Sequence, residues 1–134
     1  MNEELGFEIR LTLSRDKAVD KVTDALKAEG FGVMTKIEMD QAFREKIGVK
    51  FRPYTILGAC NPKLAHAALT EVPELGLMLP CNVTVEADIN GSLVRIVNPE
   101  IMMQTEELAA NDTLRSVAHD ARQRLRRVAE ALRK

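Results

Sequence analysis

The sequence predicts a single α+β domain over residues 1–134, built as a two-layer sandwich of helices on a mainly antiparallel five-stranded sheet. Three observations predict this class. Five short apolar or alternating segments are typical of strands, amphipathic segments separate several of them, and a long helical repeat ends the chain. The predicted order is βαββαββ-like, with an extra short helix after the second strand and a long C-terminal helix.

The first half of the chain begins with residues 5–13, where apolar and polar side chains alternate as in a half-buried strand. Ser14 is placed to cap the helix that follows, and Gly30 to end it. Residues 31–39 predict a second strand, followed by a short helix that Gly48 closes. Alternate residues of that strand are expected on one face: Phe31, Val33, Thr35, Ile37 and Met39.

The second half begins with residues 51–60, a strand that is apolar on both faces and therefore expected inside the sheet. The pair Asn61-Pro62 predicts a helix start, because Asn caps well and Pro at the first position has no N–H to leave unpaired. Two further strands flank Asn90-Gly91, a hairpin signal. Residues 112–134 form the longest helix, whose apolar stripe packs on its own sheet or on a second copy.

Composition excludes several classes of function. The net charge is −1, aromatic residues make up 4% and Trp is absent, so we expect no nucleic-acid partner. The N-terminus, MNEELGF, is acidic where a signal peptide is basic, and no apolar run is long enough to span a bilayer. We therefore expect no membrane partner and a cytoplasmic location with reduced thiols.

The two cysteines are the most suggestive residues. Cys60 precedes a helix N-terminus, whose positive dipole lowers a thiol pKa and favours a nucleophilic, redox or metal-binding role. Burial as a small apolar side chain explains the same residue. Cys81 starts the fourth strand, and the two thiols lie close together if the third and fourth strands are neighbours. His66, on the helix after Asn61, is a candidate partner for them.

A basic cluster is the other candidate site. Lys46, Lys50, Arg52 and Lys63 surround the segment that leads to Cys60. Together with the free amides after Asn61, they suit a carboxylate or phosphate. A solvated basic rim is the alternative.

Five segments carry a family resemblance: TKI at 35–37, EKIG at 45–48, FRPYTILGACNP at 51–62, LAHAAL at 64–69 and LPCNV at 79–83. Through them the chain resembles the bacterial and archaeal domain-of-unknown-function family 302. The resemblance implies a compact α+β domain that tends to form homodimers, and it implies no established activity. The matching motif residues are Arg52, Tyr54, Gly58, Cys60, Asn61, Pro62, Pro80, Cys81 and Asn82.

These observations lead to one main hypothesis, a cytoplasmic homodimeric domain that binds a small molecule or a metal ion. Its candidate ligand-binding residues are Cys60, Asn61, Cys81, Asn82, Arg52, Tyr54 and His66. One alternative is a thiol-dependent enzyme or redox protein that uses Cys60. The other is a structural interaction module whose final helix makes the dimer. The sequence assigns no catalytic residue, identifies no cofactor and leaves open whether a reaction is catalysed.

Overall fold

The structure is a computed structural model that describes all 134 residues. Five antiparallel strands form one sheet in the order β1-β5-β4-β3-β2, which confirms the predicted sheet. The interior position of β3 agrees with its sequence, which is apolar on both faces. The strands are β1 (Gly6–Leu11), β2 (Gly32–Glu38), β3 (Tyr54–Cys60), β4 (Cys81–Asp88) and β5 (Gly91–Val97).

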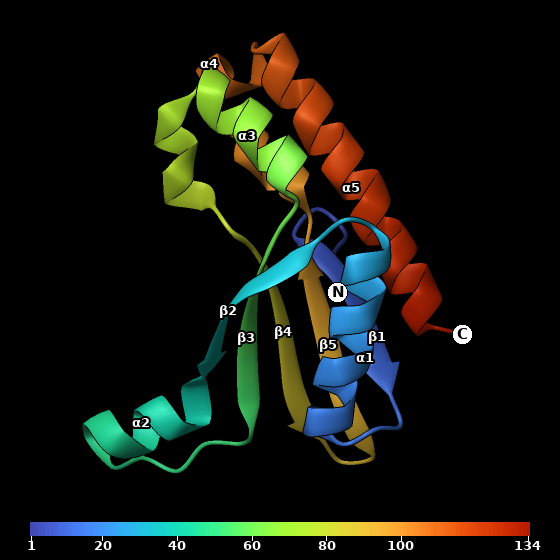
Figure 1. The fold of residues 1–134 in the computed structure, drawn as a ribbon. Coiled ribbons are helices and arrows are strands. Elements are labelled where there is room, and N and C mark those ends of the chain that lie inside the picture. The colour runs from blue at the N-terminus through green and yellow to red at the C-terminus, as the bar shows by residue number, and fades with distance from the viewer.

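Two long helices, α1 and α5, cover one face of this sheet, while α3 packs on α5 beyond one end of the strands (Figure 1). Helix α2 projects from the opposite end (Figure 1). None of the helices is both long and apolar enough to cross a membrane. The helices are α1 (Arg15–Ala28), α2 (Met39–Ile47), α3 (Pro62–Glu71), α4 (Glu106–Ala109) and α5 (Asp112–Leu132), with 3₁₀ turns η1 (Pro73–Met78) and η2 (Pro99–Met103).

Local sequence signals set several of these boundaries. The Ser14 hydroxyl accepts a hydrogen bond from the Lys17 amide at 3.3 Å, and the Asn61 side chain accepts one from the Leu64 amide at 3.2 Å. Each supplies a partner for an amide that has none within its own helix. Gly48 ends α2 in the left-handed conformation, with φ of 67°. The predicted starts of α1 and α3 are therefore confirmed.

The hydrophobic core consists of two clusters. The larger one joins the covered face of the sheet to α1 and most of α5. The smaller one lies beyond the end of the strands and contains Ala68, Leu75, Met102, Leu114 and Ala118. Helix α5 contributes to both clusters, so it ties the two parts of the core together.

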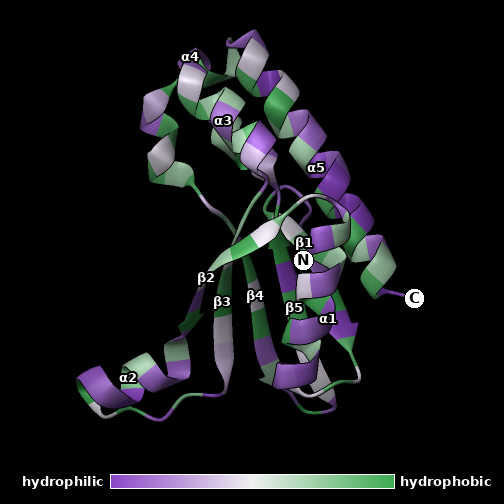
Figure 2. Cartoon of the chain, in the orientation of Figure 1, coloured by the Kyte–Doolittle hydropathy of each residue, from purple (hydrophilic) through white to green (hydrophobic).

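The apolar stripe of α5 is buried in its own chain, which decides between the two arrangements predicted for it. Figure 2 shows hydrophobic and hydrophilic bands alternating along this helix. Helix α5 therefore packs its apolar stripe on its own chain, which is the first of the two predicted arrangements. The buried residues of the helix are Leu114, Ala118, Ala121, Leu125, Val128, Ala129 and Leu132.

Strand β2 departs from the predicted alternation. A register shift lies between Val33, which pairs with Ala59, and Thr35, which pairs with Gly58. An extra residue in one strand reverses the side on which later side chains emerge. Val33 therefore packs against the larger core cluster, whereas Ile37 lies on the other face and is exposed. The prediction that Phe31, Val33, Thr35, Ile37 and Met39 share one face is wrong, because a bulge leaves no trace in simple alternation.

Candidate functional site

Neighbouring strands bring the two cysteines together. Ala59 of β3 pairs directly with Cys81, the first residue of β4. Cys60 follows Ala59 as the last residue of β3, where the chain turns into α3. The condition under which the sequence predicted proximity, adjacency of the third and fourth strands, is therefore met.

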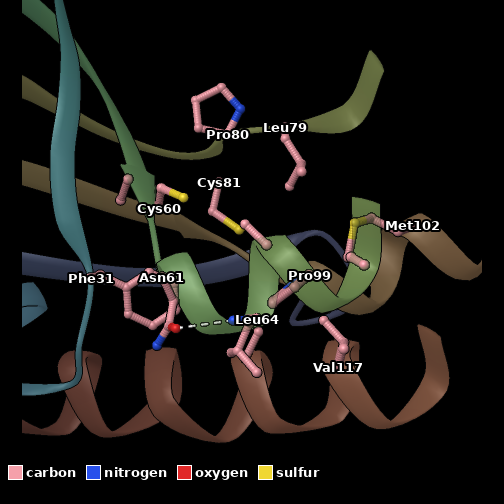
Figure 3. A pocket seen from close by; sticks show the side chains of 14 residues that line it. Phe31, Cys60, Asn61, Leu64, Leu79, Pro80, Cys81, Pro99, Met102 and Val117 are labelled. Carbon is pink, nitrogen blue, oxygen red and sulfur yellow. Dashed lines mark hydrogen bonds between the residues drawn. The ribbon is translucent and has the colours of Figure 1, made fainter. Parts of the chain in front are cut away.

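Both thiols line one small apolar cavity of about 30 Å³. In Figure 3 the two sulfur atoms point into the same space at the end of the sheet. Helix α3, turn η2 and helix α5 close the other sides. The remaining wall residues are mostly apolar: Phe31, Ala59, Asn61, Leu64, Ala65, Ala68, Leu79, Pro80, Pro99, Met102, Val117 and Ala121.

The cavity lies where the two core clusters meet. Phe31, Ala59 and Ala121 belong to the larger cluster, and Ala68 and Met102 belong to the smaller one. The wall therefore combines residues from the sheet end with residues from the helical cap above it. Ordinary close packing stops at this boundary and leaves room for a ligand the size of a few atoms.

The cavity keeps Cys81 protonated at neutral pH. Burial raises the pKa of the Cys81 thiol from 9.0 to about 11, and the neighbouring Cys60 adds to this rise. Neither cysteine is in a disulfide. Because the thiolate is the nucleophilic form, this rise lowers the reactivity of Cys81.

Asn61 has a definite structural task beside the thiols. Its side-chain oxygen caps α3 through the Leu64 amide, and the residue is buried. It also lines the wall of the thiol cavity. The expectation that Asn61 lies with Cys60 and Cys81 is therefore met, although a helix cap alone accounts for its side-chain oxygen.

Two other candidates point elsewhere. His66 is exposed on α3 and does not line the cavity. Asn82 pairs with Gly58 on the face of the sheet opposite α1 and α5, and it is exposed. Asn82 is therefore not in the wall of the cavity that Cys81 lines.

Arg52 and Tyr54 lie at the far end of β3 from Cys60. A strand of this length spans about 20 Å, so neither residue reaches the thiols. Arg52 instead lies over the ring of Phe51, 4.5 Å from its centroid, and pairs with Glu86 at 3.4 Å. The Tyr54 ring lies near Phe51 as well, with 6.1 Å between centroids.

The predicted basic cluster is split in the same way. Lys46 is in α2, and Lys50 and Arg52 are in the loop that leads to β3. Lys63 is on α3, beyond the other end of that strand. These four residues therefore form no single anion pocket, because nearness in sequence is lost across an extended strand.

The sequence did not reveal the helical wall of the cavity. Pro99 and Met102 come from η2, and Val117 and Ala121 come from α5. Spacing along the chain predicted an apolar stripe on the last helix and carried no information about which strand end that stripe faces. Only the packing of α5 across the end of the sheet brings these residues to the thiols.

The donor set is soft and small. No group of three or more His, Cys, Asp and Glu side chains is arranged to hold a metal ion. The ligand atoms in the cavity are the two thiol sulfurs, and the Met102 thioether lies at the far end from them (Figure 3). Such a set suits a two-coordinate soft ion or a thiol–disulfide pair, and it does not supply the four ligands of a structural zinc site.

Comparison with known proteins places the chain in a family. The family model described as "Domain of unknown function DUF302" matches residues 7–132. An uncharacterized conserved DUF302 protein from Bacillus stearothermophilus has a similar crystal structure, with a TM-score of 0.83 and 25% sequence identity over 96% of this chain and 98% of that one. No curated protein matches the sequence. The chain therefore belongs to the DUF302 family.

Proposed function

We propose that this protein binds a single soft metal ion, Cu(I), between Cys60 and Cys81. The observation that carries the proposal is that two free thiols line one apolar cavity. Soft thiolate ligands suit Cu(I), zinc and iron–sulfur clusters, and the last two take about four protein ligands. Two sulfur donors provide a complete two-coordinate site for that ion.

The size and polarity of the cavity support a bare ion as the ligand. Pockets for drug-sized molecules measure roughly 300–1,000 Å³, whereas this cavity measures about 30 Å³. Its walls are almost entirely apolar, which disfavours a small anion or a hydrated divalent cation. A dehydrated monovalent ion held by sulfur meets both conditions.

Metal binding also requires Cys81 to lose its proton. A metal-bound thiol is deprotonated, so the ion must displace a proton whose pKa is about 11. The positive ion offsets the cost of burying the thiolate, which is the main cause of that high pKa. We therefore expect Cu(I) affinity to increase with pH across the neutral range.

Competition with a chromogenic Cu(I) chelator under anaerobic conditions tests the proposal. We expect one Cu(I) per chain, and a loss of affinity of roughly 100-fold or more in either Cys60→Ser or Cys81→Ser, because removing a ligand costs at least as much as removing its supporting contacts. Met102→Leu is the matched control and leaves affinity unchanged. Unaltered binding in the double serine variant would sink the proposal.

The same geometry favours a redox role as a second candidate function. Two thiols at one cavity can form an intrachain disulfide, with hydrogen peroxide as oxidant: the thiols lose two protons and two electrons, and the peroxide takes them up and becomes two molecules of water. Mass spectrometry of peroxide-treated protein then shows the loss of two hydrogens and no free thiol. Stepwise addition of oxygen to either cysteine, without a disulfide, contradicts this role.

Both roles require reduced cysteines at rest, so we propose a cytoplasmic location for the protein.

We further propose that it forms a homodimer through α2 and its flanking segments. Helix α2 has no buried residue, and Ile47 and Val49 are 67% and 46% exposed. Exposed apolar side chains gathered at one place are typical of a protein interface. Met34 and Ile37 of the edge strand β2, which leads into α2, are exposed as well.

A further inference from the structure

We propose a second binding site, for a small oxyanion such as a carboxylate or phosphate group, on the side of Asn61 away from the thiols. An open cavity of about 420 Å³ lies there. It is bounded by the N-terminus of α3, the turn at Gly30 and the middle of α5. The site is separate from the proposed Cu(I) cavity, and the two share only Asn61 and Leu64 in their walls.

The Asn61 side chain supplies the first donor. This residue is only 8% exposed. Its oxygen caps α3 through Leu64, while its amide nitrogen donates to no protein group. Figure 3 shows that nitrogen turned away from the thiols and toward α5. That nitrogen reaches the open cavity and is free to donate a hydrogen bond to an oxyanion there.

The position of this nitrogen agrees with the cavity wall. A Cβ atom placed on Gly30 would lie 3.0 Å from Asn61 Nδ2 and 3.7 Å from Arg124 Nη1. The absence of a side chain at Gly30 thus leaves the approach to both donors open. Gly30 itself adopts φ of 86°, which favours glycine at this turn.

Charge and backbone orientation add to the donor set. Lys63 and Arg124 bring two positive charges to the cavity and Asp120 brings one negative charge, so the three side chains leave one net positive charge. Pro62 has no N–H and the Leu64 amide donates to Asn61, so the Lys63 amide is the free backbone donor of this first turn, at the positive end of the helix dipole. A singly charged oxyanion balances this arrangement.

Arg124 is held in place for such a role. Its Nε donates to Asp120 at 2.9 Å and its Nη1 donates to the Glu29 carbonyl at 3.1 Å. These two bonds fix the plane of the guanidinium and leave its second terminal nitrogen unused. A pre-oriented guanidinium loses less freedom when it binds an oxyanion than a mobile one.

Titration of the full-length protein with inorganic phosphate and, separately, acetate tests the proposal by amide NMR at constant ionic strength. We expect saturable shifts at the Asn61 side chain and at Gly30 and Lys63. Arg124→Gln weakens binding about tenfold, because a charge-assisted hydrogen bond is lost. Arg126→Gln, on the same helix near Glu3, is the control and leaves binding unchanged.

Asn61→Asp separates binding from folding. Aspartate caps a helix as well as asparagine does, so the fold is retained, while a carboxylate oxygen replaces the amide donor and repels the anion. We expect phosphate and acetate binding to be lost in this variant. A response to phosphate alone identifies a phosphate group, and a response to both identifies the shared oxyanion chemistry. Shifts that never saturate, or that persist in Asn61→Asp, overturn the proposal.

Discussion

Cys81 and Cys60 show how much the environment of a thiol matters at the scale of single residues. Both are free and partly buried at the same strand ends. Apolar neighbours deprive a Cys81 thiolate of solvation, so its proton is retained well above neutral pH. In the sequence, the dipole of the helix after Cys60 suggested an activated thiol. That dipole acts next to Cys60, and it does not determine the pKa of Cys81.

The raised pKa of Cys81 predicts how stability varies with alkaline pH. Between about pH 9 and pH 11 the unfolded chain has lost this proton and the folded chain keeps it, so the unfolded state binds fewer protons. The free energy of unfolding therefore falls as pH rises, by about 2–3 kcal/mol from this group over that range. Denaturant unfolding of the protein and of Cys81→Ser measures it.

The comparison isolates Cys81 from lysines and other groups that titrate in the same range. Wild type loses more stability than Cys81→Ser as the pH rises, whereas the Cys60→Ser control retains the steeper loss. Equal slopes for wild type and Cys81→Ser contradict the raised pKa.

Gly58 gives a second lesson at this scale. A Cβ atom there would lie 2.7 Å from Cγ of Pro80 and would collide with the Thr35 hydroxyl. The GACNP segment therefore needs glycine because two side chains close over the strand at that point. This requirement is steric, and it explains the residue without a phosphate-binding role.

At the scale of elements, α5 and α2 are used in opposite ways. Helix α5 buries its whole apolar stripe and joins both parts of the core. Helix α2 buries none of its residues and is attached through Phe43, whose ring packs edge-to-face on Phe51 with 5.2 Å between centroids. An isolated helix of nine residues is marginal in water, so α2 gains most from a partner.

The proposed homodimer is tested on this element. We expect Ile47→Asp to raise the dimer dissociation constant about tenfold or more, because burying an unpaired charge is costly. Sedimentation equilibrium measures the change. Ile89→Asp, at a site that is 94% exposed in the β4–β5 turn, is the matched control and leaves the dimer intact. A monomeric wild type, or a dimeric Ile47→Asp variant, rejects this interface.

At the scale of the whole molecule, alternation and capping residues were enough to predict the order of elements and the layer arrangement. Ser14, Asn61 and the Asn90-Gly91 pair act through bonds to near neighbours, so their effect is visible in the sequence. The bulge in β2 was not visible in the sequence, because it depends on pairing with β3. Tertiary pairing decides such details after local preference is satisfied.

The candidate site was predictable only in part for the same reason. Cys60, Asn61 and Cys81 flank one strand–helix–loop connection, and adjacent strands bring its ends together. Arg52 and Tyr54 share a sequence motif with Cys60 and are separated from it by the length of β3. Met102 and Val117 reach the cavity from distant segments, through packing that no local pattern records.

The location of the thiol cavity between the two core clusters has a consequence for cooperativity. The strands and the helical cap meet there across empty space, with α5 as the main continuous link. An ion bound between Cys60 and Cys81 would fill part of this cavity, on the side that the sheet forms. Occupancy would then couple the opening of the cap to the unfolding of the sheet, and the empty protein would let the cap exchange its amide protons on its own.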